Sequence, residues 1–266
     1  SRGQNFLIHE NVIEAILRLL DLKQDDGVVE IGPGLGFLTR RLLHRAGEVW
    51  AVEVDGTLVE RLRQNDWAAA VKFHLIHGDI LTVSLDEMLP RAKLKLAGNL
   101  PYSIATAVLF RIFDWRACFS TLVLMLQKEV ADRIIAAPGT RDYGALSVWC
   151  QLHGRVTKRV SVSPEAFFPR PKVRSTVLKI ELFDQPLIDT DDLAALRGLV
   201  RAVFGQRRKT LSNNLAAWLG RARAEVDGFL TSCGVDPKRR GETLSVAEFI
   251  ALAGRLKRDG LLTSAN

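Results

Sequence analysis

Cysteine is scarce in this 266-residue sequence, which has only Cys118, Cys150 and Cys233, far apart and without a CxxC pair. This number and spacing indicate neither a disulfide framework nor a zinc site, so a reducing compartment fits best. No apolar run reaches the roughly 18–20 residues that a membrane-spanning helix needs, and the first residues show no signal-peptide pattern. We therefore expect a cytoplasmic protein, with an organellar matrix as the alternative.

The sequence also lacks an acidic balance, because 37 Lys and Arg residues outnumber 30 Asp and Glu residues and leave a net charge of +7. A basic surface attracts polyanions, since each Lys or Arg that approaches a phosphate releases counterions. Nucleic acid is a reasonable partner, although solubility alone explains the charge equally well. The five histidines show no ligand spacing, and the sequence predicts no metal site.

Short apolar runs alternate with helical patterns over the first half of the chain. This alternation predicts an α/β fold with a parallel sheet that helices cover on both faces. Ligands of such sheets bind beyond the carboxyl ends of the strands, near the point where the strand order reverses. The predicted parallel strands are VVEI (28–31), VWAVEV (49–54), VKFHLI (71–76), KLKLAG (93–98) and STLVLML (120–126).

The character of the chain changes toward the C terminus. Residues 155–162 and 173–182 alternate like antiparallel strands and are expected to extend the sheet. A connection rich in Pro and Asp follows from about Asp184, and only helical patterns come after it. We expect a catalytic domain over 1–186 and a small helical, RNA-binding domain over 187–266.

The segment EIGPGLGFLT (30–39) follows the first predicted strand and opens a helix. Its glycines, Gly32, Gly34 and Gly36, let a ligand approach the backbone, and the start of the helix offers free N–H groups. Dinucleotide-binding folds prefer G-x-G-x-x-G, so the G-x-G-x-G spacing and Pro33 favour S-adenosylmethionine instead. A plain strand-to-helix turn is the alternative.

Acidic side chains end the next two predicted strands. Glu53 can accept hydrogen bonds from both ribose hydroxyls of the cofactor, and Asp79 can accept one from its adenine amino group. Either residue alone is more often a solvated carboxylate. Their occurrence at successive strand ends favours a cofactor site.

The fourth predicted strand ends in NLPY, at the same edge of the sheet. If the substrate is an adenine, its N6 amine is a poor nucleophile toward the methyl group of S-adenosylmethionine. Asn99 Oδ1 and the Leu100 carbonyl can accept the hydrogens of this amine and so orient its lone pair. Pro101 restricts φ and removes a competing donor, and Tyr102 offers an aromatic face. Proximity and electrostatic stabilisation then accelerate methyl transfer, and no general base is needed. A turn that contains proline is the alternative.

Further segments occur with these sites in one order: GQNFL (3–7), QKEVADR (127–133), YGALS (143–147), FFPRPKV (167–173) and GVDPKRRGETLSVAEFIAL (234–252). Over nearly the whole chain this set resembles the small-subunit ribosomal RNA adenine dimethyltransferases. That family has a Rossmann-like class I methyltransferase sheet and makes two adjacent N6,N6-dimethyladenosines near the 3′ end of the RNA. The resemblance implies S-adenosylmethionine as donor, S-adenosylhomocysteine as product, no metal, a monomer, and an immature 30S-type particle as partner.

The resemblance also assigns residues. In FFPRPKV it assigns the stacking of a flipped base to Phe167, the aromatic residue of the motif, and places Phe168 at the position where any residue can occur. Packing in the core is the alternative for both. The cofactor contacts fall on Gln4, Asn5, Leu7, Gly32, Gly34, Gly36, Glu53, Asp79 and Asn99. The target adenine falls to Asn99, Leu100, Pro101 and Tyr102. The predicted RNA contacts are Lys172, Arg174, Arg207, Arg208 and Lys209, with a solvated helix face as the alternative.

Three other functions stay open from the sequence. A large-subunit ribosomal RNA adenine methyltransferase shares much of the pattern, but NLPYSIAT and the C-terminal segment favour the small-subunit group. DNA adenine methyltransferases usually carry Asp or Asn before Pro-Pro-Tyr and a separate target-reading domain. A non-catalytic nucleic-acid-binding factor does not need the glycine loop, Glu53, Asp79 and NLPY together.

Overall fold

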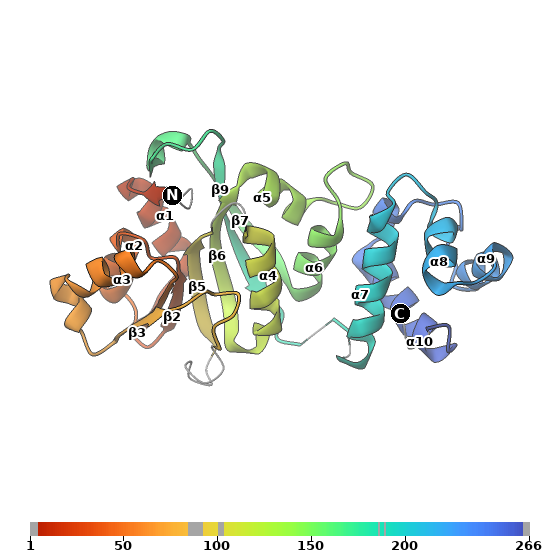
Figure 1. Ribbon diagram of the computed structural model, residues 1–266, viewed down its shortest axis with the longest axis horizontal. Coiled ribbons are helices and arrows are strands. Elements are labelled where there is room, and N and C mark those ends of the chain that lie inside the picture. The colour runs from red at the N-terminus through yellow and green to blue at the C-terminus, as the bar shows by residue number, and fades with distance from the viewer. Residues whose placement is uncertain (1–4, 85–92, 101–103, 186, 189, 263–266) are drawn as a thin grey trace. The chain divides into compact units, whose positions relative to one another are not determined.

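The computed structural model describes residues 5–84, 93–100, 104–185, 187–188 and 190–262. The chain divides into two compact units (Figure 1). The first unit comprises Ser1–Ala131 and Gly154–Asp184, and the second comprises Asp132–His153 and Gln185–Asn266. The chain passes between the units after Ala131, His153 and Asp184, whereas the sequence predicts a single boundary after residue 186. Residues 132–153 group with the C-terminal helices, whereas the predicted 1–186 domain placed them with the sheet.

A seven-stranded sheet forms the centre of the first unit, in the order β4-β3-β2-β5-β6-β9-β7. The five strands from β4 to β6 are parallel, and β9 pairs antiparallel with both β6 and β7. The prediction of a parallel sheet with an antiparallel extension is confirmed. The strands are β2 (Gly27–Ile31), β3 (Glu48–Glu53), β4 (Phe73–His77), β5 (Leu94–Asn99), β6 (Phe119–Gln127), β7 (Gly154–Val162) and β9 (Ser175–Leu182).

The strand order reverses between β2 and β5. From β2 the chain moves outward to β3 and β4, and it then returns to place β5 on the other side of β2. Because parallel crossovers are right-handed, the helices after β2 and β3 lie on one face of the sheet and the helix after β5 lies on the opposite face. The helices of this unit are α1 (Glu10–Leu20), α2 (Phe37–Leu43), α3 (Gly56–Arg63) and α4 (Ala105–Asp114), and α5 (Lys128–Ile135) begins in it.

Both faces of the central strands β2 and β5 are largely buried, as their mostly apolar sequences require. Val28 and Val29 are neighbours on β2 whose side chains point to opposite faces, and both have no exposed surface. Leu96 and Ala97 on β5 behave in the same way. Val28 and Ala97 share one core cluster with apolar side chains of α1 and α2. The sheet is therefore a rigid support for the loops at its edges.

The second unit is helical, as predicted. Residues 132–153 belong to it because α6 contacts α7 and α10, and because Gly139 N donates to Glu242 O at 2.7 Å. Within the described ranges, no helix has the length and apolar character that crossing a bilayer requires. The main helices of this unit are α6 (Ala145–His153), α7 (Thr190–Gly205), α8 (Leu211–Leu219), α9 (Arg223–Ser232) and α10 (Val246–Arg258).

Candidate active site

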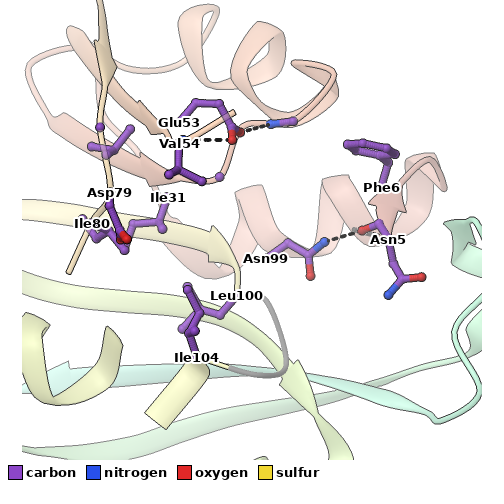
Figure 2. A pocket seen from close by; sticks show the side chains of 14 residues that line it. Asn5, Phe6, Ile31, Glu53, Val54, Asp79, Ile80, Asn99, Leu100 and Ile104 are labelled. Atoms are coloured by element: carbon purple, nitrogen blue, oxygen red, sulfur yellow. Dashed lines mark hydrogen bonds between the residues drawn. The ribbon is translucent and has the colours of Figure 1, made fainter. Parts of the chain in front are cut away.

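A pocket with about 790 Å³ of non-protein space, part of it open to solvent, lies at the carboxyl ends of β2, β3, β4 and β5. This is the edge of the sheet, beside the reversal of strand order, at which we expected a ligand. Figure 2 shows Val54, Asp79 and Ile80 together on one side, and Asn99, Leu100 and Ile104 on another. The lining residues are Asn5, Phe6, Ile31, Gly32, Gly34, Val52, Glu53, Val54, Gly78, Asp79, Ile80, Asn99, Leu100 and Ile104.

The glycine loop between β2 and α2 forms one wall of this pocket. Gly32 and Gly34 have φ angles of +67° and +59°, which L side chains rarely adopt. A Cβ atom at Gly34 would also lie 2.9 Å from Cδ1 of Phe6. Gly36 does not line the pocket; it is the N-cap of α2, with a φ of +81°. The loop can therefore pass close to a ligand only because glycine occupies these positions.

Glu53 ends β3 and is almost completely buried, with 3% of its surface exposed. Its Oε1 accepts from the backbone N–H groups of Val54 and Asp55, both at 3.0 Å. Its Oε2 accepts from Gly34 N at 3.2 Å, on the side of the glycine loop (Figure 2). These three bonds hold the carboxylate against the glycine loop. An ionised carboxylate offers about four acceptor sites, so capacity remains for a ligand hydroxyl.

Asp79 lies in the loop after β4, where its Oδ1 accepts from Leu81 N at 2.9 Å and its carbonyl accepts from Val83 N at 2.8 Å. The turn thus presents the side chain to the pocket. The flanking Val54 and Ile80 supply apolar surface suited to the faces of a purine ring. Sequence reasoning did not single out these two residues, although AVEVD and GDIL contain them next to Glu53 and Asp79.

Asn99 ends β5, and its Nδ2 donates to the Asn5 carbonyl at 2.8 Å (Figure 2). This bond orients the amide. Asn99 Oδ1 has no hydrogen-bond partner among the described residues, so it can accept a hydrogen bond from a ligand. Leu100 is buried, and its N–H donates to Met125 O at 3.1 Å, so the β5 pairing continues one residue past Asn99. Gln4, Pro101 and Tyr102, which we also assigned to the site, lie outside the described residues.

Glu30 is a functional candidate that the motif analysis missed. It lies on β2 in a smaller hollow beside the main pocket, which Gly32, Gly34 and Asn99 also line. Its side chain is 2% exposed, and its Oε2 has no hydrogen-bond partner among the described residues. Burial, reinforced by the charge of Glu53, raises the pKa of Glu30 to about 7. The signal was present in VVEI, where a carboxylate interrupts an otherwise apolar strand.

The two phenylalanines of FFPRPKV differ sharply in exposure. Phe167 is 3% exposed and belongs to the core, whereas Phe168 is 68% exposed. The reason is a short two-stranded sheet in which β1 (Phe6–Leu7) pairs with β8 (Phe167–Phe168) and sets Phe167 opposite Leu7. The burial of Phe167 matches core packing, the alternative that the sequence left open, and its assignment to base stacking stays a prediction. Leu7 is likewise a core residue that lines the smaller hollow and not the main pocket.

The predicted RNA contacts fall into two groups. Lys172, Arg174, Arg208 and Lys209 are exposed, and none has a recorded ion-pair partner among the described residues. Arg207 differs, because its guanidinium donates to the carbonyls of Arg141 at 2.8 Å and Tyr143 at 3.2 Å. Arg207 thereby holds a loop within the helical unit.

A comparison with protein-family models matches residues 1–257 to "Ribosomal RNA adenine dimethylase". The chain belongs to this family. The predicted class of enzyme, an S-adenosylmethionine-dependent ribosomal RNA adenine dimethylase with a class I methyltransferase fold, is thereby confirmed.

Curated relatives and solved structures agree with this membership. "Ribosomal RNA small subunit methyltransferase A" of Geobacter metallireducens is 46% identical over 255 residues, which cover 94% of this chain and 92% of the relative. The protein of the same name from Clostridium botulinum is 41% identical over 93% of this chain and 90% of its own. A crystal structure of a Plasmodium falciparum dimethyladenosine transferase has the same fold, with a TM-score of 0.82 at 23% identity, over 96% of this chain and 98% of that one.

The residues of the pocket fit the methyl donor of this family. S-adenosylmethionine carries a ribose, an adenine and positively charged groups. Glu53 has acceptor capacity left for a ribose hydroxyl, and Asp79 with Val54 and Ile80 suits an adenine. In the adjoining smaller hollow, the buried, unpartnered Oε2 of Glu30 suits a cation. Among the described residues, no group of three or more His, Cys, Asp or Glu side chains could hold a metal ion.

Proposed function

We propose that this chain transfers methyl groups from S-adenosylmethionine to N6 of two adjacent adenines near the 3′ end of small-subunit ribosomal RNA, and that it acts during ribosome assembly. One observation carries the proposal. Glu53 and Asp79, which suit the cofactor, and Asn99, which suits an amine, line one pocket although they come from three different strand ends. The curated relatives named as small-subunit methyltransferases support the choice of RNA.

The chemistry that this site must promote is the attack of a weak nucleophile. S-adenosylmethionine, when bound, supplies an electrophilic methyl group, and S-adenosylhomocysteine is the other product. Asn99 Oδ1 accepts one hydrogen of the adenine N6 amine, and the Leu100 carbonyl accepts the second. As the N6–C bond forms and the S–C bond breaks, the amine nitrogen becomes acidic and releases a proton to water. We propose that catalysis comes from this placement and from the local electrostatics, without a metal.

The remaining assignments are proposals of the same kind. Glu53, Asp79, Asn5 and the glycine loop hold the cofactor, and Tyr102 and Pro101 complete the adenine site. Arg208 and Lys209 in the helical unit, with Lys172 and Arg174 in the sheet unit, contact RNA phosphates, because all four are exposed cations. We further propose that a monomer acts in the cytoplasm on an immature 30S-type particle.

A second candidate is methylation of large-subunit RNA. The crystal structure of the 23S ribosomal RNA methyltransferase ErmE resembles this chain with a TM-score of 0.69 at 26% identity, over 95% of this chain and 100% of that one. The curated relatives at 46% identity carry the small-subunit name, which favours the first candidate.

The deciding experiment incubates the protein with methyl-labelled S-adenosylmethionine and, separately, unmethylated small subunits, large subunits or duplex DNA. Nucleosides from each reaction are then separated. We expect label in N6,N6-dimethyladenosine from small subunits alone. Label from large subunits or DNA, or label only in monomethyladenosine, would contradict the proposal.

A further inference from the structure

The short β1–β8 sheet places two phenylalanines on one face. Phe6 lies directly opposite Phe168, and Leu7 lies opposite Phe167. Adjacent side chains on a strand point to opposite faces, and directly opposed residues share a face. Leu7 and Phe167 are 9% and 3% exposed and belong to the core. The other face, with Phe6 and Phe168, is therefore turned away from that core.

This other face belongs to the candidate active site. Phe6 lines both the main pocket and the smaller hollow that contains Glu30, and it lies against the glycine loop at Gly34. Figure 2 shows its ring on the side of the pocket where Asn5 and Asn99 meet. Phe168 is not among the residues that line the pocket. As the cross-strand neighbour of Phe6, it stands next to the pocket and keeps 68% of its surface exposed.

Cationic residues follow Phe168 closely in the sequence. Lys172 and Arg174 are exposed, and neither has an ion-pair partner among the described residues. Proteins hold single-stranded nucleic acid by combining exposed aromatic rings with exposed cations, since bases stack on the rings and phosphates pair with the charges. A single exposed apolar side chain needs no explanation by itself, but the position of Phe168 beside the pocket calls for one.

We propose that Phe168 stacks on an unpaired base of the substrate RNA, and that this base belongs to the nucleotide next to the target adenine. The inference rests on the proposed function. The target adenine must leave its stack to reach Asn99, which also frees the neighbouring base. Phe167 cannot supply this surface without leaving the core. Phe168 can, because its face is already exposed and lies outside the residues that surround the target.

The test compares Phe168→Ala, Phe168→Leu and Phe168→Trp with Val71→Ala as the matched control. Val71 is an exposed apolar residue of the same unit, 96% accessible, that lies outside the pocket. For each variant we would measure kcat/KM on unmethylated small subunits and, by calorimetry, the Kd for S-adenosylmethionine. Urea unfolding midpoints would show whether each variant folds like the wild type.

We expect Phe168→Ala to lower kcat/KM by about 5- to 140-fold, which is the loss of one base stack on an aromatic ring. Phe168→Trp should retain wild-type activity, Phe168→Leu should resemble Phe168→Ala, and Val71→Ala should stay within about twofold. The Kd for S-adenosylmethionine should not change in any of them.

Three results would overturn the proposal. They are an unchanged kcat/KM for Phe168→Ala, full activity of Phe168→Leu, and an equal loss for Val71→Ala. In all three the wild type still methylates small subunits, so the proposed function survives. If the wild type itself does not methylate small subunits, the proposed function fails, and this inference fails with it.

Discussion

Replacing Glu30 by Gln should change how the stability of the ligand-free protein depends on pH. Glu30 is buried, and burial raises its pKa from an ordinary value of 4.5 to about 7. Between these two values the folded chain holds a proton at Glu30 that the unfolded chain has released. Because the folded state then binds more protons, the contribution of Glu30 to stability is present at low pH and is lost as the pH rises through 7.

The size of the effect follows from the two pKa values. A difference of this size corresponds to roughly 3 kcal/mol between full protonation and full ionisation. Between pH 5.5 and pH 8.0 the wild type should lose about 2 kcal/mol of stability relative to Glu30→Gln, since glutamine does not ionise. The titrating groups that do not interact with Glu30 are common to both proteins, so they cancel in the comparison.

The assay is urea unfolding of both proteins at pH 5.5 and pH 8.0 without S-adenosylmethionine. Glu48→Gln is the matched control, because Glu48 is exposed at the start of β3 and should not produce this difference. Parallel pH dependence of the wild type and Glu30→Gln would refute the reasoning. The cationic cofactor should bind the ionised form, so its Kd should rise as the pH falls below 7 in the wild type but not in Glu30→Gln.

Four further substitutions test the site and the surface. Asn99→Ala should lower the methylation rate by roughly 10²–10³-fold in single-turnover assays, with much less effect on cofactor affinity, because the amine loses an acceptor that it needs most in the transition state. Glu53→Gln should weaken cofactor binding in calorimetry by roughly 10- to 150-fold, since hydrogen bonds to a charged group are lost, whereas Glu48→Gln should not. Arg207→Ala should lower the free energy of unfolding by about 1 kcal/mol, because it frees two carbonyls, while Arg208→Ala should weaken binding to small subunits and leave stability unchanged.

For three of these variants the contrary result is specific. Wild-type turnover by Asn99→Ala would remove the proposed role of its Oδ1. An unchanged Kd for Glu53→Gln would place the ribose elsewhere. Loss of subunit binding without loss of stability in Arg207→Ala would return that residue to the RNA contacts.

Much of the site could be predicted because its residues sit in short motifs at strand ends. Each parallel strand has an apolar sequence that marks where it ends, and parallel strands end at one edge of a sheet. Glu53, Asp79 and Asn99 could therefore be brought together without coordinates. Glu30 was missed because its importance depends on burial and on the lack of a partner, which a strand sequence does not state.

By itself the sequence determined the parallel sheet, its antiparallel extension, the glycine loop and the family, because these depend on local patterns and on the order of motifs. The tertiary structure alone decided which of Phe167 and Phe168 enters the core, since the pairing of β8 with a distant β1 sets that choice. It also decided that residues 132–153 join the helical unit and that the Arg207 guanidinium donates a hydrogen bond to the Tyr143 carbonyl. These outcomes depend on partners far away in the chain, and no local pattern encodes them.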